Sequence, residues 1–270
     1  MSVPTRSPKE VPVPASRPST LVARRIAPVV ALVLVKKNQV PVVPARLRHG
    51  LVRVVEDGFT EGQVIYQETI HDLLNNGWSV YVIDHRNQGF STRLIEGEDG
   101  RDKGHVDRFE RLVLDLDRFV DLVVRSRADS PRGKRPLVLL AHSMGGPIAI
   151  SATLRNPGRV RRLVLAVTSG GLPALREFMH DWRPEHRAKY PQAATWLADY
   201  DRDLTPHLPR IRVPTLLLWG DSDPISPLLI AERLRGMLPD AKLHIVKGGT
   251  HDLVRSHASE LCTLIAEHLR

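Results

Sequence analysis

From residue 51 to the end of the chain, short apolar runs alternate with longer stretches in which apolar residues recur at helical spacing. The short runs predict strands at Leu51–Val55, Trp78–Ile83, Leu137–Ala141, Val160–Val167, Thr215–Trp219 and Lys242–Val246. The periodic stretches predict helices at Gly62–Asn76, Val106–Arg127, 144–155, Leu229–Leu238 and Ala258–Leu269. Buried strands that alternate with amphipathic helices are typical of an α/β protein with a mostly parallel sheet and helices on both faces.

The first fifty residues follow a different pattern. Prolines recur among serines and charged residues in the first twenty positions, so residues 1–25 are predicted to be a disordered, basic, Pro-rich tail. The apolar run Ile26–Val35 lies between two pairs of basic residues and predicts a first strand. A signal peptide is a weaker alternative, because no small-residue cleavage site follows the run. A membrane-surface anchor is another weaker alternative. No apolar run is long enough to span a bilayer.

The stretch 172–208 interrupts the alternation between two predicted sheet strands. It must therefore leave the sheet and return, and it carries several large apolar side chains: Leu175, Phe178, Met179, Trp182, Tyr190, Trp196 and Tyr200. These side chains need an apolar surface to cover, which favours a short helical cap over a plain surface excursion. The α/β core is then predicted to comprise residues 26–171 and 209–270.

Composition narrows the functional classes. A chain of 270 residues is long enough for one large domain. The formal net charge is +9, but residues 1–50 hold nine basic residues and one acidic residue, so the rest of the chain is nearly neutral. This distribution argues against a nucleic-acid-binding domain. The single cysteine, Cys262, fits a reducing compartment and a cytoplasmic location, and its place in a predicted amphipathic helix favours core packing.

The segment Leu137–Gly146 has the strand–turn–helix pattern of a nucleophile elbow centred on Ser143. Such a turn is tight enough to require small residues two positions before and after the serine. Ala141, in place of the commoner glycine, and Gly145 meet this requirement. An elbow exposes the serine hydroxyl at the carboxyl end of a strand, which makes Ser143 the candidate nucleophile.

A serine hydroxyl needs a base to accept its proton and an acid to orient that base. His251 follows the predicted strand at 242–246, and Asp223 follows the one at 215–219, so both lie at the sheet edge where ligands gather in α/β proteins. Asp223 is the favoured acid, with Asp221 and Asp252 as alternatives. His142 is a weaker candidate base, because its side chain is expected to point away from the pocket.

Two backbone donors are needed to stabilise a developing oxyanion. The N–H of Met144, directly after the nucleophile, is one candidate. The other is the N–H of Phe59, in the loop after the predicted strand Leu51–Val55.

The chain resembles α/β-hydrolases of the monoacylglycerol lipase and lysophospholipase group. The similarity rests on Gly58–Glu61, Asp84–Ser91, Gly104–Val106 and Ala141–Gly146, and is strong over roughly residues 57–146. It implies hydrolysis of a carboxylic ester through an acyl-enzyme on Ser143, without a metal or an organic cofactor. Asp84 and Arg86 are expected to fix loops.

The chain departs from the family pattern at several positions. Asp57 stands where the group usually has histidine, and an ionised Asp57 near the oxyanion would repel it. Asn87 replaces a usual glycine, and asparagine is among the residues that tolerate a positive φ. The predicted cap is also short, which implies a more open pocket.

The sequence therefore predicts a serine hydrolase acting on monoacylglycerols, lysophospholipids or small acyl esters. Other acyl chemistry on the same residues remains open, such as that of a lactonase, thioesterase, amidase or haloperoxidase. A non-catalytic binding protein of the same fold is the alternative from another class. The expected partners are a small-molecule ester and, through the basic N-terminus, a membrane surface; the oligomeric state is left open.

Overall fold

The computed structural model describes residues 27–36, 66–76, 78–86, 91, 106–124, 137–168, 171–178, 181, 183–189, 191 and 203–269. These residues form one sheet of six strands in the order β2-β1-β3-β4-β5-β6. The strands are β1 (Ala27–Lys36), β2 (Trp78–His85), β3 (Leu137–His142), β4 (Val160–Ala166), β5 (Thr215–Gly220) and β6 (Ala241–Val246). The predicted strand Leu51–Val55 lies outside the described residues.

The sheet is mostly parallel, as predicted. β3, β4, β5 and β6 pair in parallel, and β1 runs antiparallel between β2 and β3. Ala27 lies opposite His85 and Ala31 opposite Ala141, so the amino end of β1 lies beside the carboxyl ends of β2 and β3. The prediction of a strand at the first apolar run is confirmed, but its direction could not be read from the sequence.

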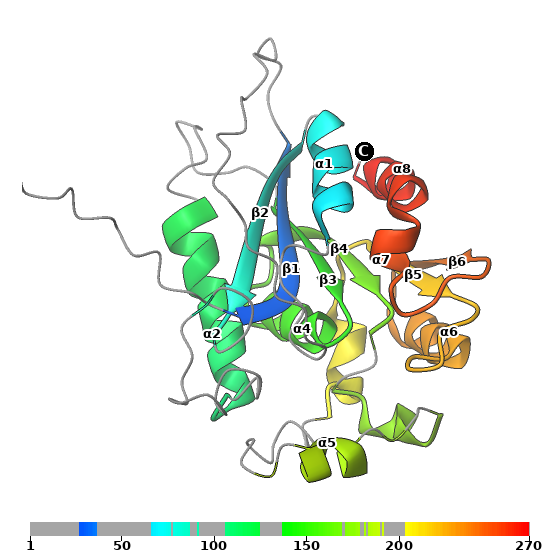
Figure 1. Cartoon of the computed structure of the whole chain (residues 1–270). Helices are drawn as coiled ribbons and strands as arrows, with labels where there is room; N and C mark the ends of the chain where they lie inside the picture. Colours follow the sequence, from blue (N-terminus) through cyan, green and yellow to red (C-terminus); the bar gives the residue numbers. More distant parts are fainter. Residues whose placement is uncertain are drawn as a thin grey trace, which may run out of the picture.

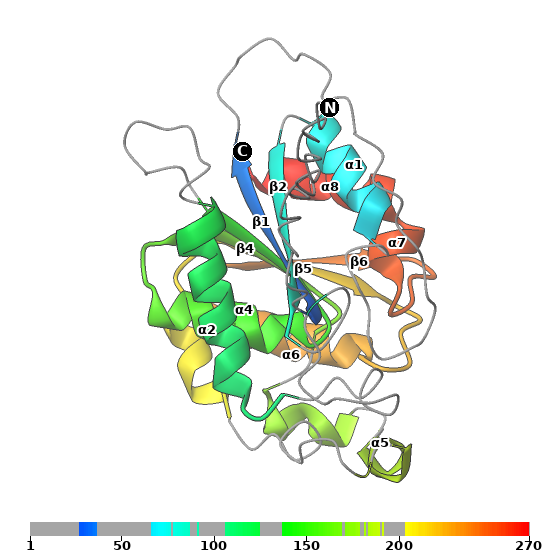
Figure 2. The same cartoon turned by 60° about the vertical axis from the view of Figure 1, so that its left-hand side comes forward.

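Helices cover both faces of the sheet (Figures 1 and 2). The helices α1 (Gln67–Asn75), α7 (Leu253–Ser256) and α8 (Ala258–His268) lie on one face. The helices α2 (Phe109–Phe119), α4 (Gly145–Arg155) and α6 (Leu228–Met237) cover the other. Every residue of β3 and β5 is buried, as is expected for strands packed on two faces.

The apolar residues that predicted α2 do face the core. Leu112 and Leu116 are almost fully buried, and so is Val120 just after the helix. The long helix predicted over Val106–Arg127 is present in the described residues as the α-helix Phe109–Phe119, which continues into a π-helical turn over Val120–Val124. Three of its five residues are valine, whose branched Cβ disfavours the α-helix. Cys262 is buried in the core on α8, where burial raises the pKa of its thiol to about 12.

The insertion after β4 extends away from the core, and its two ends lie side by side. It contains the 3₁₀ helix η4 (Pro173–Phe178) and helix α5 (Arg183–Lys189), and leads into the 3₁₀ helix η6 (Thr205–Arg210). The N–H of Leu204 donates to the carbonyl of Gly171 at 2.8 Å, which joins its two ends. Phe178 lies against Arg233 of α6, with the guanidinium 5.8 Å from the ring centroid. The excursion is as predicted, whereas its role as a cap over a site stays a prediction.

The loops after β5 and β6 touch at two glycines. A Cβ atom on Gly220 would lie only 1.9 Å from the carbonyl oxygen of Gly249. The N–H of Ser222 also donates to that carbonyl, at 3.0 Å. The backbone approach at Gly220 therefore brings the loop that carries Asp223 against the loop that carries His251.

We expect Gly220→Ala to lower the free energy of unfolding by about 3 kcal/mol, since the backbone of Gly249 would have to shift to make room for the new Cβ. Gly236→Ala is the matched control: apart from its chain neighbours and the adjacent backbone of α6, no heavy atom lies within 4 Å of the new Cβ. This change within α6 should raise stability by about 0.5–1 kcal/mol through helix propensity. Urea unfolding of both variants measures the difference, and equal stabilities would contradict the close approach.

Candidate active site

Ser143 sits at a sharp turn between β3 and α4. Its φ is +50°, a backbone conformation that residues other than glycine seldom adopt. The N–H of Ser143 donates to the carbonyl of Ala166 on β4 at 3.0 Å. Its own carbonyl accepts a hydrogen bond from the N–H of Gly146 at 3.1 Å. The turn is thus anchored to the neighbouring strand on one side and to the new helix on the other.

The small residues around Ser143 are required by packing. Ala141 and Gly145 are both buried. Gly146 has no room for a side chain, because a Cβ atom there would lie 1.9 Å from the Thr168 hydroxyl oxygen. That hydroxyl donates to the carbonyl of Ser143. Thr168 follows Val167, a buried residue whose φ is +42°. Sequence reasoning missed this second strained residue, which nothing in the local pattern signals.

The structure brings Ser143, His251 and Asp223 into one hydrogen-bonded chain. Nε2 of His251 lies 2.9 Å from the Ser143 hydroxyl oxygen, and Nδ1 lies 2.9 Å from a carboxylate oxygen of Asp223. The Asp223 side chain is fully buried, and that of His251 is 16% exposed. A neutral imidazole held this way can accept the serine proton at Nε2 while Nδ1–H donates to the carboxylate.

The loop after β5 fixes Asp223. The second carboxylate oxygen of Asp223 accepts the N–H groups of Ile225 at 2.8 Å and Ser226 at 3.0 Å. The indole N–H of buried Trp219 donates to the Ser226 carbonyl at 2.7 Å. These bonds satisfy a buried carboxylate and fix the direction of its free oxygen toward His251.

The two alternative acids have other partners. A carboxylate oxygen of Asp221 accepts the N–H of Gly248 at 2.7 Å and the hydroxyl of Ser222 at 2.9 Å, so Asp221 joins the two loops. The carboxylate of Asp252 pairs with Arg255 at 2.8 Å. The geometry therefore favours Asp223 as the partner of His251.

His142 is not a rival base, but it is part of this site. Its ring is buried, with Nε2 2.8 Å from the His251 carbonyl oxygen and Nδ1 2.9 Å from the Tyr66 hydroxyl. From the sequence, the His142 side chain is expected to point away from the pocket, and no partner for its ring is predicted. The elbow motif alone carries no signal for a contact made 109 residues away.

Of the two predicted oxyanion donors, the structure describes one. Met144 follows Ser143 at the amino end of α4, where the first N–H groups of a helix have no partner in a preceding turn. Phe59 lies outside the described residues, and so do Asp57 and Asn87. The N–H of Met144 is therefore placed beside the serine, and the Phe59 donor stays a prediction.

Arg86 fixes the chain after β2, as expected. Its guanidinium binds Asp115 on α2 through two hydrogen bonds, of 2.6 and 2.7 Å. His85, just before it, is fully buried, and burial lowers the pKa of its imidazole to about 4. Nearby Asp115 opposes that shift and Arg86 adds to it.

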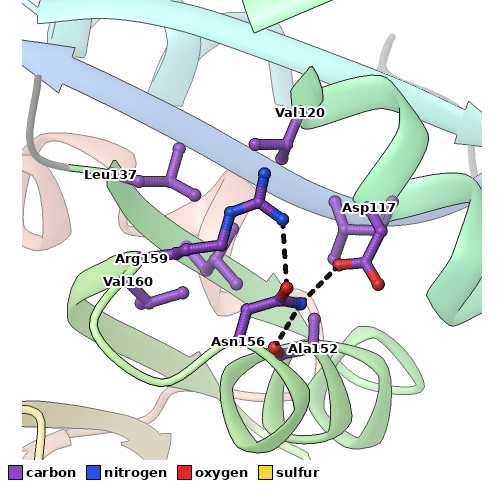
Figure 3. A pocket seen from close by; sticks show the side chains of 9 residues that line it. Asp117, Val120, Leu137, Ala152, Asn156, Arg159 and Val160 are labelled. Carbon is purple, nitrogen blue, oxygen red and sulfur yellow. Dashed lines mark hydrogen bonds between the residues drawn. The ribbon is translucent and has the colours of Figure 1, made fainter. Parts of the chain in front are cut away.

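A pocket elsewhere in the fold is distinct from this site. It lies between α2, β3 and α4, beside Leu137 and Val160, the first residues of β3 and β4 (Figure 3). Asn156 crosses it, donating to Asp117 and accepting from Arg159. Ser143 follows the carboxyl end of β3, whereas this pocket lies beside the amino ends of β3 and β4. Among the described residues, no group of three or more His, Cys, Asp or Glu side chains is arranged to hold a metal ion.

Comparison with known proteins identifies the family. Residues 49–194, more than half of the chain, match Hydrolase_4, described as serine aminopeptidase, S33. This chain belongs to the Hydrolase_4 family of α/β-hydrolases. Residues 186–270 of this Hydrolase_4 protein also match a family described as TAP-like protein.

Relatives of this Hydrolase_4 protein include curated proteins and solved structures. Lysophospholipase L2 of Escherichia coli (strain K12) is 36% identical over 138 residues, which cover 50% of this chain and 38% of the relative. The chain thus spans less than half of that relative's length. Monoacylglycerol lipase of Paleococcus ferrophilus has a TM-score of 0.55 at 18% identity, over 78% of this chain and 92% of that one. Bromoperoxidase from Bacillus anthracis has a TM-score of 0.58 at 17% identity, over 79% and 89%. At these identities the two structures show the fold alone.

We expect the stability of the protein to fall as the pH drops from 6.5 to 4, in part because of His85. The lowered pKa means that the unfolded state binds a proton in this range while the folded state does not, so stability rises with pH here. The His85 contribution is about 3 kcal/mol.

Urea unfolding at several pH values tests this expectation, with His85→Gln as the variant and His71→Gln, at an exposed position on α1, as the control. The His85 variant should lose much of the pH dependence between pH 4 and 6.5. If unfolding free energy changes with pH as steeply in the His85 variant as in wild type, His85 does not cause the pH dependence.

Proposed function

We propose that this protein is a serine hydrolase that cleaves carboxylic esters through an acyl-enzyme. One observation carries the proposal: His251 lies within hydrogen-bond distance of both the Ser143 hydroxyl and the buried carboxylate of Asp223. Membership of an α/β-hydrolase family supports it, since the family match includes Ser143 and the elbow around it.

In the proposed reaction, the Ser143 oxygen attacks the ester carbonyl while Nε2 of His251 takes the hydroxyl proton. Asp223 holds Nδ1–H and stabilises the imidazolium that forms. The N–H groups of Met144 and Phe59 would stabilise the oxyanion. His251 then protonates the leaving alcohol. Water, activated by His251, attacks the acyl-enzyme and releases the acid.

For the substrate, we propose a monoacyl lipid such as a lysophospholipid or a monoacylglycerol. The 36% identity with lysophospholipase L2 supports this class. The likeness to a bromoperoxidase shows why the fold cannot decide the chemistry. A substrate panel that compares acyl chain lengths and headgroups is therefore the direct test of specificity.

We expect the wild-type protein to hydrolyse p-nitrophenyl esters and Ser143→Ala to reduce turnover to background, because no nucleophile remains. Asp223→Asn should lower kcat by about 10⁴-fold, since the amide leaves His251 in the wrong tautomer. Ser259→Ala and Asp240→Asn, at exposed positions, are matched controls that should keep wild-type rates. A spectrophotometric assay from acetyl to palmitoyl esters measures all of these.

A fluorophosphonate probe gives an independent readout of the same site. Wild-type protein should be labelled at Ser143, and Ser143→Ala should not. Full ester turnover by Ser143→Ala would place the nucleophile elsewhere. Absence of both labelling and turnover in the wild type would overturn the proposed activity and favour a binding protein.

We also propose that the basic N-terminal segment contacts anionic lipid surfaces. The support is its charge: nine basic residues and one acidic residue lie within positions 1–50. Each basic residue near an anionic surface contributes about 1 kcal/mol of attraction. Among the described residues, no helix is long and apolar enough to cross a membrane.

Replacing Arg17, Arg24 and Arg25 with glutamine should weaken binding to phosphatidylserine vesicles by at least about tenfold, as the loss of three such charges implies. The matched control replaces Arg118, Arg210 and Arg235, which are exposed on the folded body. Vesicle sedimentation at low and high salt compares the two. Equal losses in both variants would show that the N-terminal segment has no special role.

A further inference from the structure

A buried histidine directly precedes the candidate nucleophile. His142 ends β3, whose other residues are apolar, and its side chain is almost fully buried. A buried imidazole is costly unless its nitrogens are hydrogen-bonded. Both are: Nε2 lies 2.8 Å from the His251 carbonyl oxygen and Nδ1 lies 2.9 Å from the Tyr66 hydroxyl.

These partners assign the tautomer of the neutral ring. A carbonyl oxygen can only accept, so the proton must lie on Nε2 of His142, which donates to His251. Nδ1 is then unprotonated and accepts the hydroxyl proton of Tyr66. With the opposite tautomer, the Nε2 lone pair would face the lone pairs of the carbonyl. Tyr66, which is almost fully buried just before α1, thus holds the ring in its donating form.

His142 therefore connects the two reacting groups of the site. Its own backbone leads directly into Ser143, and its ring holds the main chain of His251. The rings of His142 and His251 also pack, with centroids 5.1 Å apart. Asp223 fixes the imidazole of His251 from Nδ1, whereas His142 fixes the backbone from which that side chain extends.

We propose that His142 is a positioning residue for the general base, and that Tyr66 sets the tautomer in which it acts. This inference rests on the proposed function, because it assigns His251 the role of base. His142 acts on the reaction through His251. Loss of its N–H should therefore affect the chemical step more than substrate binding.

The test compares His142→Leu, which removes the donor, with His142→Gln, whose side-chain amide can offer an N–H close to the position of Nε2. A base displaced by about 1 Å can lose about a hundredfold in rate, so His142→Leu should lower kcat by that order with little change in KM. His142→Gln should recover most of the loss. Rescue by a polar amide, but not by an apolar side chain, is not expected of a residue that only fills space.

Tyr66→Phe tests the second half of the proposal with the removal of a single oxygen atom. It should lower kcat by about three- to tenfold, since the donating tautomer is no longer enforced. In the His142→Leu background the same change should lower kcat much less than it does in wild type, because the ring whose tautomer it sets is absent. Tyr81→Phe, at a partly buried position on β2, is the matched control and should keep wild-type kcat.

Proton NMR provides a readout that needs no substrate. The His251 proton that bonds Asp223 should give a low-field resonance in wild type that broadens or shifts in His142→Leu and Tyr66→Phe, and persists in His142→Gln. Unchanged kcat and an unchanged resonance in an active Tyr66→Phe protein would overturn the role of Tyr66. The same result in His142→Leu would overturn the proposal.

Two further outcomes are distinguishable. If His142→Leu does not fold, His142→Met, which also lacks the N–H donor, takes its place: kcat and resonance equal to wild type in that variant would overturn the proposal. If the wild type hydrolyses no ester and Ser143 is not labelled, the proposed function fails. The resonance then decides alone whether His142 positions His251.

Discussion

The turn at Ser143 is the constraint on which the rest of the site depends. A positive φ at a residue with a side chain costs about 1–3 kcal/mol, and it persists only where the surroundings hold it. Here the Ser143 backbone is held by hydrogen bonds with Ala166 on the next strand, with Gly146 at the start of α4 and with the hydroxyl of Thr168. The strain at Val167, next to Thr168, lies in the same small region. Close packing thus presents the serine hydroxyl at the sheet edge.

The same edge receives the other two side chains because parallel strands place their carboxyl ends together. Proximity of the strands alone would leave the loops too loosely placed for hydrogen bonds of 2.9 Å. Backbone contact at Gly220 and Gly249, together with the carboxylate of Asp221, holds the loops after β5 and β6 against each other. His142 then connects the second of these loops to the elbow. Each reacting group is therefore held by a neighbour from another part of the chain.

Much of this arrangement could be predicted from local pattern. Buried strands such as Leu137–Ala141 and the amphipathic helices between them identify a parallel sheet, because their periodicity reflects which faces are covered. The spacing of small residues around Ser143 reflects a steric requirement of one turn. The positions of Asp223 and His251 after strands follow from the rule that sites gather at strand carboxyl ends. These features are local, and the structure agrees with them.

Local sequence is therefore enough to predict the strand–helix alternation, the elbow at Ser143 and the candidate partners Asp223 and His251, since each is encoded by neighbours a few positions apart. Which aspartate meets His251 depends on the folded loop, because Asp221 and Asp223 differ in the direction that the loop gives their carboxylates. The fold as a whole also sets the antiparallel direction of β1 and the contacts of His142 with Tyr66 and His251. Such contacts join residues 76 and 109 positions apart, and no local pattern records which distant groups the fold brings together.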